Sequence, residues 1–315
     1  MTSLTAAPPA KAKAGKWTPS RGAGTRIPLR RQLLLQLLCL FVTLTVLFPI
    51  LYIVGIALDP RNLPRPDSLF PPGASLDAFA RVLEHPTQLD PVSFMDLAIN
   101  SFKLAALTSL ATVLIGVTAA YAFSRLKFRF REFLMIAILG VLMLPAVATI
   151  APLFIFLNGI KVDLPILGSF NLRQSLLGVS LAVISGALPF AIWNLKGYLD
   201  TIPKDLEEAA AVDGASQNQT FLKVVLPLAM PAIAVTAFLG FLSGWTEFYF
   251  VSTFLRDPKD YTLAYELNKM VGAFGQTPWS DFAAFAILFS LPVSAVFFFF
   301  QRYIVGGLAI GGVKG

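Results

Sequence analysis

The chain of 315 residues is 56% hydrophobic and only 14% charged, with a mean hydropathy of +0.71. Soluble proteins carry about 25% charged residues, and a soluble core could not bury this much apolar surface. The net charge of +7 does not indicate nucleic-acid binding, because the basic residues are not interleaved with aromatic residues on a soluble domain. Long apolar runs can each cross about 30 Å of hydrocarbon at about 1.5 Å per residue. We therefore predict an all-α integral membrane protein.

The chain has one cysteine and one histidine. Cys39 lies in an apolar run and has no second cysteine with which to form a disulfide bond. His85 precedes Pro86 in a polar connection, without a cysteine or a second histidine near it. We therefore expect no metal site and no catalytic residue built on either side chain.

The chain begins with a basic segment, residues 1–28, in which Ala, Pro, Gly, Lys and Arg predominate. Such a composition is typical of a disordered tail. The apolar run from Leu33 to about Leu58 is longer than the apolar part of a signal peptide, about 7–15 residues, so it should remain as the first span of a transmembrane domain over 29–315. Five further spans are predicted, at roughly 97–123, 133–157, 175–195, 229–254 and 282–301.

Lysine and arginine are distributed unevenly between alternate connections. They cluster in the tail and in the connections after the second and fourth spans, whereas the stretch from Asp59 to Asp96 after the first span is rich in aspartate. Because lysine and arginine are enriched in the cytoplasmic connections of membrane proteins, both termini should be cytoplasmic. The other basic residues on the predicted inside are Arg125, Lys127, Arg129, Arg131, Lys196, Lys204, Lys223, Arg302 and Lys314.

Several predicted spans contain proline, which removes a backbone donor and bends a helix. A bundle with such bends can enclose a pathway, although prolines are also common in membrane helices that have no such role. These residues are Pro49, Pro145, Pro152, Pro189, Pro231 and Pro292.

The longest predicted cytoplasmic connection, about 196–228, has the features of a helix–turn–helix. Pro203 suits a first helical turn, and three alanines at 209–211 favour the helix. Gly214 can adopt the left-handed conformation that ends a helix, and Ser216 can cap a second one. The acidic residues that complement the dipole of the first helix are Asp205, Glu207 and Glu208.

A longer pattern covers this connection. Glu208-Ala209-Ala210, three residues, Gly214, nine residues and Val224-x-Leu226-Pro227 resemble the EAA loop of ABC importer permeases, with Val in place of the usual Ile. The resemblance implies the type I importer architecture: six transmembrane helices and a coupling helix–turn–helix, between spans 4 and 5, that docks on a separate ATPase subunit. It assigns ATPase coupling to Glu207, Glu208, Ala209, Ala210, Asp213, Gly214, Leu226 and Pro227.

The chain contains no G-x-x-x-x-G-K-[ST] phosphate-binding loop, since Gly15-Lys16 lacks the upstream glycine and the following Ser or Thr. We therefore predict that this chain is not an enzyme and binds no cofactor. ATP and Mg²⁺ should be bound by a partner ATPase.

The last residues, 301–315, resemble the closing segment of carbohydrate importer permeases, most closely those of maltose and maltodextrin importers. The resemblance implies that a cytoplasmic tail, about 302–315, reaches the ATPase dimer through Gly311, Gly312 and Lys314. A frayed terminus is the alternative.

Three further residues are candidates for the transport pathway. Asn100 begins a matching Asn-Ser pair, and Trp245 and Glu247 lie where the resembled family has Trp-Asn-Glu-Phe; Thr246 departs from that pattern. A carboxylate such as Glu247 is costly at membrane depth and suggests a function, but a hydrogen-bonded structural acid near the interface is an equal alternative.

The resemblance as a whole implies a permease in the bacterial cytoplasmic (inner) membrane that forms half of a pathway for maltose, maltodextrin or a related oligosaccharide. Its expected partners are an ATPase dimer, a second homologous permease subunit, an extracytoplasmic sugar-binding protein and lipid. A permease for a non-sugar solute shares the EAA loop and stays an alternative. An ion-coupled transporter should have more ionisable residues deep in its spans than Glu247 and Lys103, and a membrane enzyme should have more than one histidine.

Overall fold

The computed structural model describes residues 28–65, 67–86, 92–164, 168–271 and 277–311. The chain divides into two compact units, residues 1–50 and 51–315. Five helical segments of the described residues are long and apolar enough to cross a membrane: Leu29–Leu58, Phe94–Arg125, Leu176–Thr201, Met230–Phe254 and Trp279–Tyr303. The predicted helical membrane protein is therefore confirmed, with five such segments where six were expected.

The described part of the first unit is helical and belongs to α1 (Leu29–Leu58). Its two threonine hydroxyls are satisfied within the helix: those of Thr43 and Thr45 donate to the carbonyls of Cys39 and Phe41, each at 2.8 Å. Such bonding suits a helix in lipid, where an unsatisfied polar group has no water to bind.

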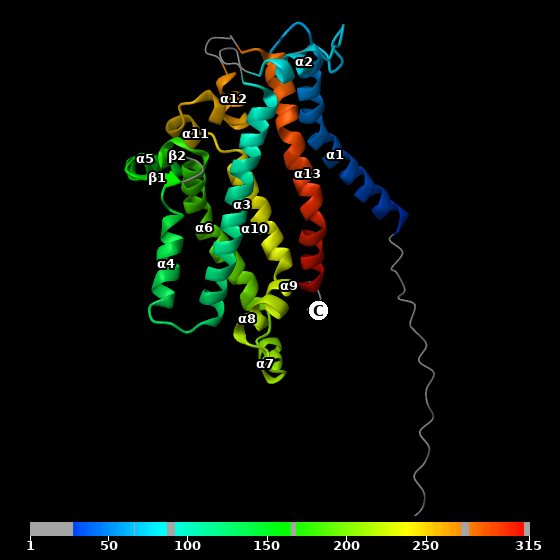
Figure 1. Cartoon of the computed structure of the whole chain (residues 1–315). Coiled ribbons are helices and arrows are strands. Elements are labelled where there is room, and N and C mark those ends of the chain that lie inside the picture. Colours follow the sequence, from blue (N-terminus) through cyan, green and yellow to red (C-terminus); the bar gives the residue numbers. More distant parts are fainter. Residues whose placement is uncertain (1–27, 66, 87–91, 165–167, 272–276, 312–315) are drawn as a thin grey trace, which may run out of the picture. The chain divides into compact units, whose positions relative to one another are not determined.

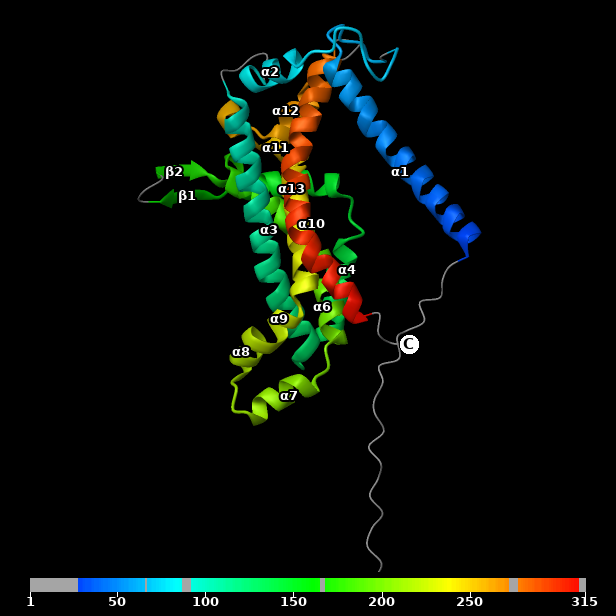
Figure 2. The same cartoon turned by 90° about the vertical axis from the view of Figure 1, so that its right-hand side faces the viewer.

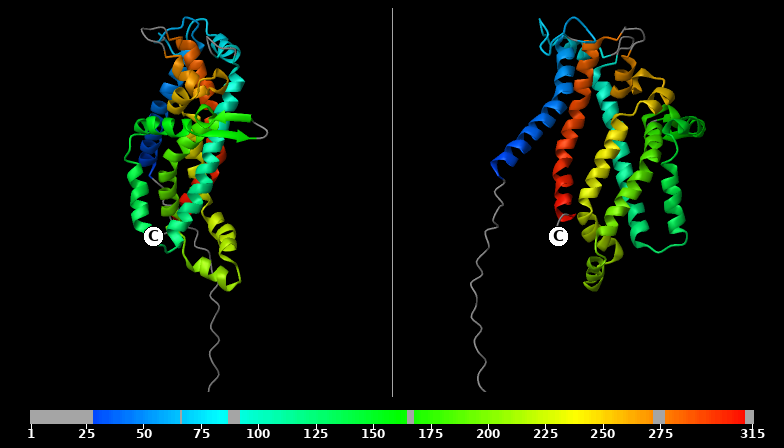
Figure 3. Two further views of the ribbon diagram at one scale, coloured as in Figure 1. Left: turned by 60° about the vertical axis from the view of Figure 1, so that its left-hand side comes forward. Right: turned by 180° about the vertical axis from the view of Figure 1, so that it is seen from behind.

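The third predicted span, 133–157, is not one helix. α4 (Arg131–Val141) ends before Pro145, a 3-10 turn η1 (Ala146–Thr149) follows, and α5 (Ile150–Asn158) runs in a different direction, as Figures 1 and 3 show. The prediction of a continuous helix was wrong here. Proline has no amide hydrogen and restrains the residue before it to an extended conformation, so Pro145 separates the two helices.

Within the second unit, α3 (Phe94–Arg125) packs against both α6 (Leu176–Thr201) and α10 (Met230–Trp245). α10 also packs against α13 (Trp279–Gly311), and α4 lies along α6 (Figure 1). A hydrogen bond of 2.7 Å from the Ser109 hydroxyl to the Ala237 carbonyl joins α3 to α10. Small residues at such contacts let membrane helices approach closely.

The two ends of this bundle carry different elements (Figure 2). At one end lie α7 (Asp205–Val212), α8 (Gln217–Thr220), a π-helical turn η3 (Phe221–Val225) and α9 (Leu226–Leu228). At the other lie α2 (Asp77–Glu84) and α12 (Leu263–Lys269). We call these the α7 end and the α12 end.

The connection between α5 and α6 contains a small antiparallel hairpin, so the structure is not purely α-helical. β1 (Lys161–Leu164) pairs with β2 (Gly168–Asn171), with Lys161 opposite Asn171. A short 3-10 turn η2 (Leu172–Gln174) then leads into α6. The hairpin is too short to leave a clear alternating pattern in the sequence.

The last two predicted spans also differ in detail. The helix predicted at 229–254 breaks at Thr246–Phe248 and resumes as α11 (Tyr249–Phe254), before a 3-10 turn η4 (Pro258–Asp260). α13 continues to Gly311, beyond the predicted end at 301.

Candidate functional site

The loop at the α7 end, residues 202–228, forms the predicted helix–turn–helix. α7 ends in a Schellman motif, in which the amides of Gly214 and Ala215 donate to the carbonyls of Ala211 (3.0 Å) and Ala210 (2.9 Å). Gly214 has the expected left-handed conformation, with φ of +88°. The prediction for this turn is confirmed.

The second helix begins as expected but does not continue as a regular α-helix. Ser216 and Gln219 form a reciprocal capping box, with bonds of 2.9 and 3.4 Å. After α8 the chain widens into η3 before α9 leads to α10. Pro203 lies just before the capping residue Lys204, outside the first turn where it was expected.

Gly214→Ala is expected to weaken the turn, because a left-handed conformation costs an L-residue about 1–2 kcal/mol. Gly214→Asn should cost less, since asparagine tolerates this conformation better. Transport by the assembled importer should fall in the order Gly, Asn, Ala, whereas Gly197→Ala, at a helical position with open space around it, should leave transport unchanged. Equal rates for Gly214→Ala and the unchanged chain would contradict the proposed importance of the turn.

Most residues that the sequence assigns to coupling lie on the surface of this loop. Val212 is 87% exposed, and Leu222 on the second helix is 57% exposed. Large apolar side chains at such exposure, on a loop outside the spans, suit contact with another protein. The assigned residues that are exposed are Glu208, Ala209, Asp213, Gly214 and Pro227, while Glu207, Ala210 and Leu226 are half-buried.

An ion pair that the sequence analysis missed attaches α7 to α3. The Arg125 Nε lies 2.5 Å from Oε1 of Glu207, and the two side chains are only 7% and 15% exposed. The Arg125 Nη2 also donates to the Ile202 carbonyl at 3.0 Å, just before α7. Glu207 therefore pairs within the chain, while Glu208 stays open to a partner.

This pair continues into α6. The Arg125 Nη1 donates to the Ser124 hydroxyl at 2.9 Å, and that hydroxyl donates to Asp200 at 2.6 Å. Lys196 forms a further ion pair with Asp200 at 2.6 Å. We call these four residues, together with Glu207, the α3–α6–α7 network. It connects the exposed loop to two spanning helices by side chains as well as by the backbone.

Two of the three pathway candidates are engaged in packing. The side-chain amide of Asn100 donates to the carbonyls of Lys259 (2.6 Å) and Tyr261 (3.1 Å), holding that segment against α3. Trp245 is 1% exposed, and its Nε1 donates to the Phe289 carbonyl at 3.2 Å, which joins α10 to α13. A pathway role for these two residues stays a prediction.

Glu247 lies elsewhere, in the break between α10 and α11. Its Oε1 accepts a bond of 2.7 Å from the amide of Phe250, so it caps α11. The half-buried side chain also lines a cavity of about 350 Å³ with Ser243 and residues of α6. Glu247 therefore lies at a cavity.

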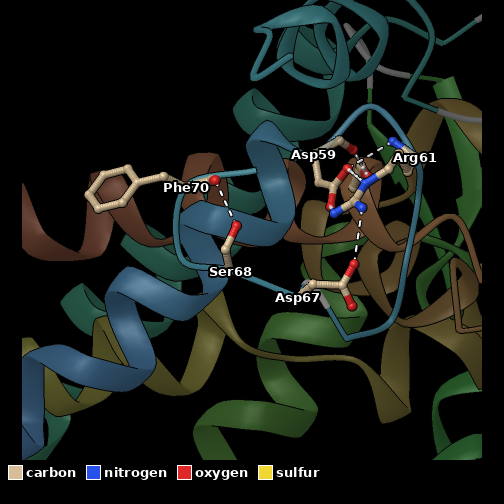
Figure 4. Close-up of polar contacts among 6 residues, drawn as sticks. Asp59, Arg61, Asp67, Ser68 and Phe70 are labelled. Atoms are coloured by element: carbon tan, nitrogen blue, oxygen red, sulfur yellow. Dashed lines mark hydrogen bonds and ion pairs between the residues drawn. The ribbon is translucent and has the colours of Figure 1, made fainter. Parts of the chain in front are cut away.

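At the α12 end, an ion cluster shapes the connection after α1 (Figure 4). Buried Asp59 pairs with Arg61 at 2.8 Å, and Arg61 reaches Asp67 at 3.1 Å. The hydrogen bond with Arg61 holds the pKa of Asp59 below its usual range, so the pair is intact at neutral pH. The same loop presents Phe70, whose carbonyl accepts a bond from Ser68 and whose side chain is 90% exposed.

A bundle of apolar spanning helices with an exposed EAA-type helix–turn–helix at one end defines the permease class of ABC importers. The family described as "Binding-protein-dependent transport system inner membrane component" matches residues 112–309, which include this loop. The chain belongs to that family. It is the membrane component of an importer and not an enzyme.

Three curated relatives extend the match over most of the chain. The maltose/maltodextrin transport system permease protein MalG of Yersinia pestis is 37% identical over 86% of this chain and 89% of its own length. The galactooligosaccharides transport system permease protein GanQ of Bacillus subtilis is 33% identical over 90% and 96%. The trehalose/maltose permease MalG of Thermococcus litoralis is 33% identical over 90% and 98%.

Solved structures confirm the fold. A bacterial ABC transporter involved in the import of the acidic polysaccharide alginate has a TM-score of 0.69 at 22% identity, covering 86% of this chain and 95% of that one. The MetNI methionine ABC transporter has a TM-score of 0.53 at 16% identity, covering 68% and 97%.

Proposed function

We propose that this permease forms half of the pathway by which maltose, maltodextrin or a related oligosaccharide crosses the bacterial inner membrane. The observation that carries the proposal is the similarity, over nearly the whole chain, to permeases named for maltose, trehalose and galactooligosaccharides. These substrates share one chemistry: neutral sugar rings joined by glycosidic bonds. A second, homologous permease subunit supplies the other half of the pathway.

Coupling to ATP is proposed to run through α7. The small side chains of Ala209 and Ala210 allow a partner's cleft to approach the helix, and exposed Val212 and Glu208 offer apolar and charged contacts. ATP and Mg²⁺ belong to the partner ATPase dimer, and this chain binds no cofactor. When the dimer closes, α7 moves with it, and the α3–α6–α7 network passes the movement to two spanning helices.

The C-terminal contact with the ATPase stays part of the proposal. Gly311 is the last residue of α13, whereas Gly312 and Lys314 lie outside the described residues. The resemblance of residues 301–315 to the closing segment of carbohydrate permeases supports the contact.

The proposed topology has six crossings, of which α4, η1 and α5 together make the third. The tail, the α7 end and the C-terminus then face the cytoplasm, in agreement with the distribution of Lys and Arg. The α12 end faces the extracytoplasmic sugar-binding protein, and exposed Phe70 gives that partner an apolar contact.

Substrate class is tested by uptake into proteoliposomes that contain the complete importer and its binding protein. We expect ATP-dependent uptake of labelled maltotriose or a related neutral oligosaccharide. Methionine and inorganic phosphate are tested in parallel as non-sugar substrates. Uptake of a non-sugar solute without any sugar would contradict the sugar assignment and leave ATP coupling untouched.

A further inference from the structure

Two adjacent cavities lie between the helices of the second unit and share Gly186, Ala187 and Ser243 as lining residues. Their volumes are about 470 and 350 Å³, within the range of about 300–1,000 Å³ typical of small-molecule sites. We propose that this pair of cavities, the Ser243 recess, is a binding subsite on this chain for one neutral sugar ring of the substrate. The proposal rests on the sugar-transport function above and deepens it.

Two interruptions of spanning segments meet at the recess. Residues 142–149, between α4 and α5, contribute Leu142, Leu144 and Thr149 to its wall. The break between α10 and α11 contributes Thr246 and Glu247. Non-helical backbone at membrane depth is tolerated only where it is buried in protein or lines a water-filled cavity. Two such breaks around one recess place backbone groups and the side chains of Thr149, Thr246 and Glu247 at a mainly apolar cavity.

The recess has a polar atom that the described part of the chain does not satisfy. Thr112 on α3 is 1% exposed, and its Oγ1 has no hydrogen-bond partner among the described residues. The residue lines the larger cavity. The hydroxyl oxygen is shielded from solvent, so a ligand reaches it when the Thr112 side chain turns toward the cavity. The new bond then recovers the cost of about 1–3 kcal/mol that an unpartnered buried hydroxyl carries.

The other hydroxyls of the larger cavity are oriented as acceptors. Those of Thr236, Ser243 and Thr246 each donate to the carbonyl four residues earlier, at 2.9, 2.9 and 2.8 Å. A hydroxyl that has given its proton to its own helix keeps its oxygen lone pairs for an incoming donor. A sugar ring carries several hydroxyl donors, which complement this set.

Charge in the recess favours a neutral ligand over an anion. Among the described residues that line the two cavities, none is lysine or arginine, and the one titratable side chain is the carboxyl group of Glu247. An acidic solute would meet this carboxyl group without a compensating cation. Phe190 adds an apolar ring face at the wall of the larger cavity.

The test measures equilibrium binding of labelled maltotriose to the complete importer, trapped with ATP and vanadate. Thr112→Val and Ser243→Ala each remove one hydroxyl and should raise Kd about tenfold, while Thr112→Ser should bind like the unchanged chain. Nothing lies within 4 Å of a Cβ added at Gly186, so Gly186→Ala should fold normally, and Gly186→Val, whose methyl groups extend into the recess, should bind the sugar poorly. The matched control is Thr118→Val on α3, the helix of Thr112, because the exposed Thr118 hydroxyl bonds carbonyls of its own helix.

The outcomes separate the subsite from the function. Unchanged Kd in Thr112→Val, Ser243→Ala and Gly186→Val would overturn the subsite, while sugar binding by the unchanged chain would uphold the sugar assignment. Failure of the unchanged importer to bind or transport any oligosaccharide would overturn both. An oligogalacturonate of similar size should not bind, and tight binding of that anion would contradict the charge argument.

Discussion

Glu207→Arg is expected to abolish coupled transport, because it places two positive charges in a largely buried site. Removing one partner of a buried ion pair costs about 3–5 kcal/mol, since the other charge is left unpaired. Arg125 is 7% exposed and also holds the Ile202 carbonyl, so α7 should lose its fixed position relative to α3. At about 1.4 kcal/mol per factor of ten, uptake should fall by about a hundredfold or more.

The double variant Arg125→Glu with Glu207→Arg restores opposite charges and should recover part of the uptake. ATPase activity of the assembled complex is measured beside uptake, since a loss of coupling lowers uptake per ATP hydrolysed whereas misassembly lowers both. Lys196→Gln, at the partly exposed edge of the same network, should lower uptake far less, because its ion pair with Asp200 contributes no more than about 1 kcal/mol. Unimpaired uptake by Glu207→Arg would show that the α3–α6–α7 network is not required for coupling.

Gly178→Ala should prevent stable folding of the second unit. An added Cβ would lie 1.9 Å from the Leu172 carbonyl oxygen. The oxygen belongs to the backbone and the Cβ is bonded directly to it, so neither can move aside as the end of a flexible side chain could. Overpacking of this kind costs about 1–3 kcal/mol even where side chains can adjust. We expect a large loss of folded protein in the membrane.

Gly197→Ala on the same helix serves as the control for that experiment. Nothing lies within 4 Å of its added Cβ, and alanine favours a helix over glycine by about 1 kcal/mol. The midpoint of thermal unfolding in detergent should therefore stay the same or rise. Equal midpoints for Gly178→Ala and Gly197→Ala would contradict the close approach of Gly178 to the Leu172 carbonyl at the start of α6.

The features that the sequence predicted well are those set by local backbone chemistry. Gly214 and Ser216 act within a few residues of themselves, so the turn and the cap of the coupling loop follow from spacing alone. The ion pair of Arg125 with Glu207 joins residues 82 apart, and no local pattern indicates it. The α3–α6–α7 network could therefore be identified only from the three-dimensional structure.

The broken third span shows a different limit. Pro49, Pro189 and Pro292 lie inside continuous helices, whereas Pro145 separates two. The segments around all four prolines are apolar, so hydropathy does not distinguish them. Packing decides whether a helix continues through proline. The hydroxyls of the Ser243 recess were missed for a related reason: each is an ordinary residue of an apolar helix until neighbouring helices bring them together.

The most direct test of the account is to purify the chain with the subunits that accompany it and to measure ATP hydrolysis, with and without sugar-loaded binding protein. We predict that a separate ATPase co-purifies and that the loaded binding protein stimulates it. Gly214→Pro, which disrupts the turn of the coupling loop, should abolish the stimulation and the transport. An absence of any accompanying ATPase, or intact transport by Gly214→Pro, would contradict the account.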